Sequence, residues 1–337
     1  MSRTTLRDLA KKLNLSVSTI SRALNDSPEI SDATKSKVIE ASLALDYHPN
    51  ILARGLINKQ TKIIGVIVPE ITHDFFSLAI SGISEVAYNA GYVIMLCQSN
   101  ESYDREVINT NALVSNQIAG LIVSISQETK RHDHFEYLQR IGIPLVFFDR
   151  VCESLKTSKI VVDDHGGAFR AVEYLIKKGR KRIAHLGGTE HLSISRDRFT
   201  GYLDALHTFG IPFDNNLVYF SGFQEQNGVK GMQVLFELEK HPDAIFAVND
   251  PVAIGAYEEI RNRGLRIPDD IAVVGFSNNP VAAIIDPPLT TIEQPAYELG
   301  RRAAIILLEQ IVAKTEKRKY KPVREVLETK LIIRLSA

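Results

Sequence analysis

The apolar residues at the start of the chain recur with the period of an α-helix. The first stripe has the spacing i, i+3, i+4 and i+7 and consists of Leu6, Leu9, Ala10 and Leu13. Thr5 and Asp8 have the spacing of a capping box, which predicts where this helix begins. Serine is a favoured N-cap, and Ser16 and Ser31 precede two further amphipathic stretches. Two helices joined by a short turn and followed by a third predict an all-α helix-turn-helix head.

From Ile63 the pattern changes to short apolar runs separated by amphipathic stretches. Four of these runs predict buried strands, and they are IIGVIVP, YVIMLCQS, GLIVSIS and PLVFFDR. The same order repeats from IVVDD to IAVVGFS, and a late helix, ELGRRAAIILLEQIVA, precedes end strands. Strands that alternate with helices predict a parallel sheet with helices on both faces. We therefore expect two doubly wound α/β lobes with a cleft between them.

The charge is unevenly distributed along the 337 residues, although the net charge is zero. The first 62 residues contain ten Lys and Arg against six acidic residues, so this segment carries +4 and the remainder −4. A neutral total excludes a uniformly basic coat. A basic first segment is typical of a nucleic-acid-binding head, although a solvated charged face would give the same count.

The outward side of the second predicted helix is small, polar and smooth, which suits a helix that lies in the major groove of DNA. We expect base contacts from Val17, Ser18, Ser21 and Arg22. Arg22 is the candidate for a two-bond contact with guanine. We expect phosphate contacts, which position the head without reading the sequence, from Thr5, Ser16, Thr19 and Asn25. A three-helix bundle that binds protein is the alternative.

Several motifs resemble the lactose/galactose repressor family of bacterial transcription regulators. They are TLRDLAKKLNLSVSTISRALND, ISDATKSKVIEASLALDYHPN and ARGLINKQTKIIGVIVP, and the similarity continues through the chain. The chain departs from the family at Leu13, where alanine is usual. The resemblance implies a repressor that binds a palindromic operator as a dimer. It also implies control by a small ligand, a sugar or sugar derivative, with a purine-like metabolite as the alternative.

The resemblance also supplies domain limits. It implies a head at 1–48, a hinge at 49–61 and a sensor at 62–337 that shares the fold of periplasmic sugar-binding proteins. The first lobe would hold about 62–161 and 292–321, and the second about 162–290 and 322–337. In the family the hinge becomes a helix on the operator and enters the minor groove, and the matching residues here are Ala53, Arg54 and Leu56.

Polar and aromatic residues follow the ends of the predicted strands, where a ligand would bind. We expect effector contacts from Phe75, Phe76, Ser124, Asp149, Ser193, Ser195, Arg198, Phe223, Asn249, Asp250 and Ser277. Arg198, Asp149 and the pair Asn249–Asp250 match family motifs most closely. Many family members have an acidic ligand-binding residue in place of Ser277, so the class of effector stays open.

Motifs of other functional classes are absent. No phosphate-binding GxxxxGK[ST] loop, HExxH metal site or GxSxG nucleophile motif occurs. His132 and His134 lie two positions apart, whereas zinc-binding pairs on a helix are spaced i, i+4. We therefore expect no enzyme, cofactor or metal.

The cysteine content, the N-terminal sequence and the lengths of the apolar runs bear on where in the cell the protein is located. Only Cys97 and Cys152 are present, and the N-terminus lacks an apolar signal-peptide core. No apolar run approaches the roughly 18 residues of a membrane span. We expect a cytoplasmic protein without membrane contact. A secreted solute-binding protein is the alternative, but it would have no use for the head.

A dimer is expected because two heads read two half-sites related by a two-fold axis. The resemblance assigns this contact to helices after the first and third strands of the first lobe. Leu78, Ile80, Ile83 and Ala87 form a stripe that fits either the contact or the core. Family tetramers use an added C-terminal coiled segment. This chain ends at Ala337 soon after its last predicted strand, so we expect a dimer rather than a tetramer.

Leu56→Ala should weaken binding to the operator more than binding to random duplex. A leucine wedged between base steps unstacks them at a cost of a few kcal/mol, which the contacts of bent DNA offset. Affinity for both duplexes is the measurement, and an equal loss on both would refute the wedge.

Overall fold

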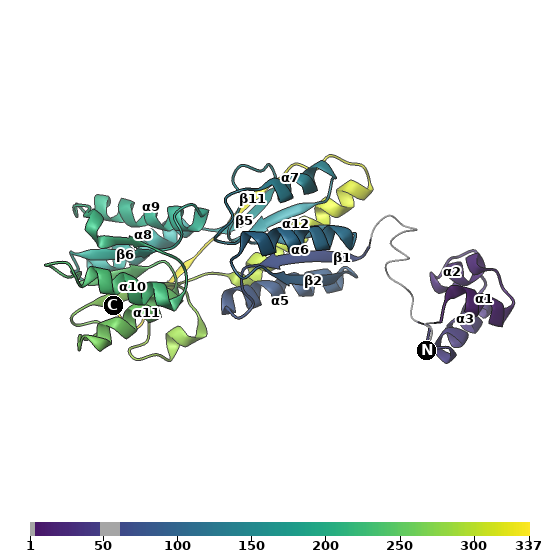
Figure 1. Ribbon diagram of the computed structural model, residues 1–337, viewed down its shortest axis with the longest axis horizontal. Helices are drawn as coiled ribbons and strands as arrows, with labels where there is room; N and C mark the ends of the chain where they lie inside the picture. Colours follow the sequence, from purple (N-terminus) through teal and green to yellow (C-terminus); the bar gives the residue numbers. More distant parts are fainter. Residues whose placement is uncertain (1–3, 48–60) are drawn as a thin grey trace. The chain divides into compact units, whose positions relative to one another are not determined.

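The computed structural model describes residues 4–47 and 61–337, and the chain divides into two units at Thr61 (Figure 1). The first unit, Met1–Thr61, is called the head below, and the second, Lys62–Ala337, is called the sensor. The predicted minor-groove residues Ala53, Arg54 and Leu56 lie outside the described residues.

The described part of the head is the predicted helix-turn-helix followed by a third helix, α1 (Leu6–Leu13), α2 (Val17–Leu24) and α3 (Asp32–Ala44). Each helix begins at its predicted cap: Thr5 forms a full capping box with Asp8, and Ser16 and Ser31 accept backbone N–H groups. The helices pack around a small apolar core that includes Leu9, Ile20 and Val38. Helix α2 therefore buries one side and leaves the other free.

The first lobe of the sensor is built on a six-stranded parallel sheet with the order β11-β5-β4-β3-β1-β2. Its strands are β1 (Ile63–Val68), β2 (Val93–Gln98), β3 (Gly120–Val123), β4 (Leu145–Phe148), β5 (Ser158–Val162) and β11 (Arg324–Leu327). Its helices are α5 (Asp74–Asn89), α6 (Tyr103–Ser115), α7 (Asp133–Arg140) and α12 (Ala296–Thr315). Helices α5 and α12 share one apolar core with the sheet, and α6 and α7 belong to another. The sheet is thus covered on both faces.

The second lobe repeats this architecture with the sheet order β12-β10-β9-β8-β6-β7. Its strands are β6 (Ile183–Gly187), β7 (Val218–Phe220), β8 (Ala244–Ala247), β9 (Ala272–Ser277), β10 (Thr290–Glu293) and β12 (Lys330–Ile332), with β12 antiparallel to β10. Its helices are α8 (Asp164–Lys177), α9 (Ser193–Thr208), α10 (Glu225–Leu235) and α11 (Asp250–Asn262), with short 3-10 turns at Asn215–Leu217 and Pro280–Ala283. The predicted pair of α/β lobes is confirmed.

The limits of the lobes differ from those expected. Residues 292–293 belong to β10 of the second lobe, and β11 belongs to the first, although 322–337 was assigned to the second. Strand β11 is held there by parallel pairing with β5 and by an ion pair of 2.7 Å between Arg302 Nε of α12 and Glu325 Oε1. The chain therefore adds a sixth strand to the first lobe before its last crossing.

Two helices of the first lobe cross at unusually close range. A Cβ atom on Gly300 of α12 would lie 2.0 Å from the carbonyl oxygen of Ala79 in α5, and one on Gly82 would lie 2.2 Å from the carbonyl oxygen of Tyr297. Only glycine permits this approach. The contact fixes α12 against the face of the sheet. Within the described ranges, no helix has the length and apolar character needed to cross a membrane.

Candidate functional site

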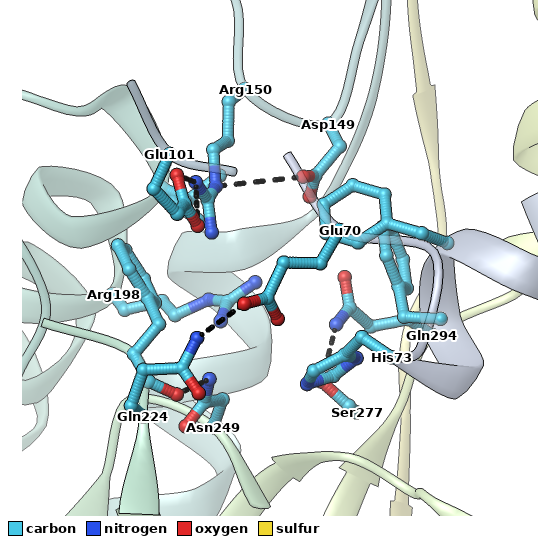
Figure 2. Close-up of a pocket in the computed structure, with 14 residues that line it drawn as sticks. Glu70, His73, Glu101, Asp149, Arg150, Arg198, Gln224, Asn249, Ser277 and Gln294 are labelled. Atoms are coloured by element: carbon cyan, nitrogen blue, oxygen red, sulfur yellow. Dashed lines mark hydrogen bonds and ion pairs between the residues drawn. The ribbon is translucent and has the colours of Figure 1, made fainter. Parts of the chain in front are cut away.

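A pocket lies between the two lobes, at the carboxyl ends of their strands (Figure 2). The cavity itself is small, about 40 Å³, so the lobes lie close together around it. Its lining residues come from segments that follow strands of both sheets, and they are Glu70, His73, Phe75, Phe76, Glu101, Asp149, Arg150, Ile194, Arg198, Phe223, Gln224, Asn249, Ser277 and Gln294.

Seven of the eleven residues expected to contact an effector line this pocket. They are Phe75, Phe76, Asp149, Arg198, Phe223, Asn249 and Ser277. The other four, Ser124, Ser193, Ser195 and Asp250, do not line it. Ser124 is buried behind the wall, where its hydroxyl donates to Asp149 Oδ2 at 3.1 Å. Ser193 and Ser195 are buried near the start of α9, and their hydroxyls have no hydrogen-bond partner among the described residues.

Asp250 supports the pocket from behind instead of lining it. Its carboxylate accepts a hydrogen bond from Thr291 Oγ1 at 2.5 Å and one from the backbone N–H of Asn279 at 2.7 Å. Complete burial raises the pKa of Asp250 to about 6, although these bonds act in the opposite direction. The preceding residue, Asn249, caps α11 with its side chain. The Asp250 side chain projects into the second lobe. Its hydrogen bonds join the start of α11 to Thr291 of β10 and to Asn279, which follows β9.

Most of the Arg198 guanidinium is bound by groups of the second lobe. Its Nε donates to Asp164 Oδ1 at 2.8 Å and its Nη1 donates to the Val248 carbonyl at 2.6 Å. The group also lies 3.8 Å from the centre of the Phe276 ring. Burial raises the pKa of Asp164 to about 7, and the charge of Arg198 opposes that rise. Arg198 is thus fixed in place, and its positive charge is already matched by a buried acid.

Arg150 connects the two lobes across the pocket. Its Nη1 lies 2.8 and 2.7 Å from the two carboxylate oxygens of Glu101, which belongs to the same lobe. Its guanidinium lies 4.3 Å from the ring centre of Phe223, which belongs to the other lobe. The Arg150 and Glu101 side chains are only 5% and 11% exposed. A charge stacked on an aromatic face at this depth is a favourable contact, so the pair helps to hold the lobes together.

Two further hydrogen bonds join the lobes beside Arg150. Gln224 Nε2 donates to Glu70 Oε1 at 2.9 Å, as Figure 2 shows, and Thr189 Oγ1 donates to Gln127 Oε1 at 3.3 Å. Gln127 itself is tied to Glu101, because its backbone N–H donates to Glu101 Oε2 at 2.8 Å. The lobes therefore contact each other through side chains from several loops.

Three lining residues keep a buried polar atom without a hydrogen-bond partner in the described chain. These atoms are His73 Nδ1, Arg150 Nε and Gln294 Oε1. Burial, and then the nearby charge of Arg150, lowers the pKa of His73, so its ring is neutral at physiological pH. Buried polar groups are usually satisfied. These atoms are therefore suited to exchanging hydrogen bonds with a bound molecule.

Some lining residues were missing from the predicted set. Glu70 and Glu101 lie two and three residues beyond β1 and β2, so the strand-end rule that selected Asp149 would also have found them. Gln294 follows β10 in a segment that crosses between lobes, and no strand-end signal marked it. No group of three potential metal-ligating side chains occurs within residues 4–47 and 61–337.

The second candidate site is the outward side of α2 in the head. Val17, Ser18 and Arg22 are exposed there, and Ser21 is half-buried. Arg22 Nη1 pairs with Glu29 Oε2 at 3.0 Å, but both side chains are more than half exposed. Such a pair contributes little stability and is easily exchanged for another partner.

The four predicted phosphate-contact residues also lie on the surface of the head. The hydroxyl of Ser16 accepts the Thr19 backbone N–H, and the Thr5 hydroxyl donates to Asp8 Oδ2 at 2.7 Å. Asn25 Nδ2 donates to the Ser21 carbonyl at 2.9 Å. Thr5, Ser16 and Asn25 are exposed, and Thr19 is half-buried. Thr5 and Ser16 thus act as helix caps in the free protein.

Comparison with known proteins gives two family matches. Residues 5–50 match the model of bacterial regulatory proteins of the lacI family, and residues 172–337 match a periplasmic binding protein-like domain. The transcriptional repressor CytR of Escherichia coli (strain K12) is 34% identical over 91% of this chain and 89% of its own length. The repressor PurR of Vibrio atlanticus (strain LGP32) is 33% identical over 96% and 97%. The structure of the regulator CelR in complex with cellobiose covers 99% of this chain and 100% of its own, at 28% identity and a TM-score of 0.76.

Arg150→Met should destabilise the sensor by about 3–5 kcal/mol, because it leaves the buried Glu101 carboxylate without its partner. The double variant Glu101→Gln/Arg150→Met should recover at least half of that loss, since no unpaired charge remains. Urea unfolding measures both variants. Arg140→Met, on the exposed side of α7, is the control with little expected effect. A double variant no more stable than the single one would contradict this account.

Proposed function

The chain belongs to the lacI family of bacterial regulatory proteins, and from that membership we propose a specific mode of action. The protein is a DNA-binding transcription regulator. We propose that it represses transcription in the cytoplasm as a homodimer on a palindromic operator, and that a small neutral ligand held between the lobes controls it. The observation that carries this proposal is the combination of a free, small-residue face on α2 with a polar and aromatic pocket between the lobes of the sensor.

The face of α2 supports the DNA-reading role. A recognition helix lies in the major groove with its first residues against the base edges, and small residues there let the helix approach closely. Val17 and Ser18 meet this condition, and Arg22 lies one turn further along the same exposed side. Because the Arg22–Glu29 pair is exposed, the guanidinium can leave Glu29 for a base edge at little cost.

An exposed apolar surface on the first lobe supports the dimer. Leu78 and Tyr88 of α5 are 49% and 80% exposed, and Val93 at the start of β2 is 65% exposed. Strand β2 is the last strand at its side of the sheet. Ile83 and Ala87 of the predicted stripe are buried in the core and leave only Leu78 and Ile80 with exposed surface. Two-fold pairing through α5 and β2 would cover this surface.

The charges of the pocket favour a neutral ligand. Both arginines are already matched, Arg150 by Glu101 and Arg198 by Asp164. Glu70 and Asp149 add two further carboxyl groups to the wall. A phosphate would meet these carboxyl groups without an uncommitted cation, which is unfavourable. A molecule with several hydroxyl groups can both donate and accept, as the free atoms of His73 and Gln294 require.

The aromatic residues of the pocket fit the same class of ligand. Phe75, Phe76 and Phe223 line it, and the apolar face of a sugar ring packs well on such rings. CelR was solved with cellobiose, a neutral sugar. A purine could also stack on a phenyl ring, and it is the second candidate.

Control would act through the arrangement of the lobes. A ligand that binds one arrangement more tightly shifts the population toward it. The paired first lobes would then move relative to each other, and this movement would set the spacing of the two hinges. A coupling free energy of about 1–3 kcal/mol between ligand and DNA changes affinity by roughly 5–150-fold.

Arg22→Ala should weaken operator binding by about 1–3 kcal/mol and relax the preference at one base pair of each half-site. Selection of duplexes from a random pool, followed by titration of the selected site, measures both effects. Glu29→Gln is the matched control, because it removes the partner of Arg22 but leaves the guanidinium free. Equal losses in the two variants would show that Arg22 acts by holding the head together.

Neutral sugars should stabilise the protein, whereas sugar phosphates of the same skeleton should not. At 100 times the dissociation constant, a ligand adds about 2.7 kcal/mol, a rise in melting temperature on the order of 5 °C. A thermal-shift screen of sugars, sugar phosphates and nucleobases makes the measurement. Gln294→Ala should reduce the response to a hit, and Gln233→Ala, on the exposed side of α10, should keep it. Stabilisation by phosphorylated sugars alone would contradict the charge argument.

A further inference from the structure

Residues 314–324, which run from the last turn of α12 to the start of β11, are strongly basic. The sensor has one other such stretch, 177–182 at the end of α8, which contains five Lys and Arg and no acidic residue. Residues 314–324 contain six Lys and Arg and one acidic residue, whereas the rest of 63–337 contains 24 basic and 33 acidic residues. Outside 314–324 the sensor therefore carries a net negative charge. A charge concentration of this kind on an acidic background favours a specific anionic partner.

The arginines of this segment already have ion-pair partners, whereas its four lysines have none among the described residues. Arg318 pairs with Glu316, and Arg324 pairs with Glu153. Lys314, Lys317, Lys319 and Lys321 form no ion pair with any described residue, and all four are exposed. They are named the lysine patch below. Their ammonium groups remain available to a partner outside this chain.

The backbone under the patch is held firmly. At the end of α12, Lys317 adopts a left-handed conformation with φ of 54°, and the Arg318 N–H closes the helix on the Ala313 carbonyl at 2.8 Å. Tyr320 then packs against the core of the first lobe, and its hydroxyl donates to Glu309 at 3.3 Å. Lys319 and Lys321 flank this anchored ring, so their side chains are displayed from a fixed backbone.

The patch lies at the end of the first lobe where the chain enters the sensor. The strands of this lobe are parallel, and Ile63, Val93, Gly120, Leu145, Ser158 and Arg324 all begin at the same edge. The last turns of α12 reach that edge, because Gln310 Nε2 donates to Ser158 Oγ at 3.1 Å. Figure 1 shows the end of α12 and the start of β1 at one end of the lobe. The pocket occupies the opposite, carboxyl edge.

The position of the patch relative to the entry point can be estimated from the sheet. Strands β11 and β1 are four steps apart, which is about 19 Å at the usual strand spacing. Residues 48–60 tether the head to the same edge, and thirteen residues span at most about 45 Å when fully extended. The head is therefore joined to the sensor at the amino edge of this sheet and not at the edge that holds the pocket.

From these observations we propose that the lysine patch contacts the phosphate backbone of the operator and adds a sensor-borne, sequence-independent component to binding. The inference rests on the proposed DNA-binding function. DNA is the partner that the observations favour, because it is densely anionic and because the head, which we propose binds it, is joined to the sensor at the edge that carries the patch. In a dimer the patch would be present twice, related by the two-fold axis.

The test compares Lys317→Gln/Lys319→Gln/Lys321→Gln with the full-length wild-type protein. Duplexes are first selected from a random pool with the wild type, and affinity for a selected duplex is then measured over a range of salt concentrations. The slope of log K against log salt should fall in magnitude by about 1.8, the value expected when each subunit of a dimer neutralises one phosphate fewer. The control, Lys178→Gln/Lys181→Gln/Lys230→Gln, removes three exposed lysines from the second lobe and should keep the wild-type slope.

Phosphate ethylation interference on the same duplex gives a second readout. The wild type should be sensitive at backbone positions where the patch variant is not, while both show the same base preferences. An unchanged slope, or an equal fall in patch and control variants, would overturn the inference. A changed oligomeric state of the patch variant at unchanged slope would also overturn it, because it would assign the lysines to a protein contact. Failure of the wild type to select any duplex would instead remove the proposed function itself.

Discussion

The common direction of the strands in the first lobe is the constraint on which the rest of the sensor depends. Because every strand of that sheet runs the same way, its carboxyl edge and its amino edge have different chemistry. The carboxyl edge holds the loops that form the pocket with the second lobe. The amino edge receives the chain from the head and carries the lysine patch. One sheet thus separates the pocket from the edge that we propose faces DNA, and a rigid-body movement of this lobe would connect the two.

Inside the pocket, buried charges are arranged so that each arginine has an opposite partner. Arg150 and Glu101 satisfy each other in the first lobe, and Arg198 and Asp164 do so in the second. Removing two charges from water is costly, and the pairing offsets much of that cost. Arg150 differs from Arg198 in one respect, since its ring partner, Phe223, belongs to the other lobe. The relative position of the lobes is therefore part of what keeps Arg150 in place.

Local signals were enough to predict the fold, and they predicted the site in part. The Thr5–Asp8 capping box and the helical stripe in the head appear in the structure as expected, because caps and periodicity act over a few residues. Asp149 and Asn249 were found at strand ends for the same reason. Asp250 was misplaced because the direction of its side chain depends on Thr291 and Asn279, which are distant in sequence. Strand β11 was assigned to the wrong lobe because its partner, β5, is also far away along the chain.

The late return of the chain to the first lobe affects how the protein is made. Helix α12 and strand β11 lie after nearly all of the second lobe in sequence, yet they cover and extend the first sheet. The ribosome therefore synthesises nearly all of the second lobe before it synthesises the elements that complete the first lobe. Until then α5 lacks the helix that packs on Gly82, and the side of β5 that pairs with β11 is open. The nascent chain must carry an unfinished first lobe through most of translation, which makes that lobe the point where a chaperone would be needed.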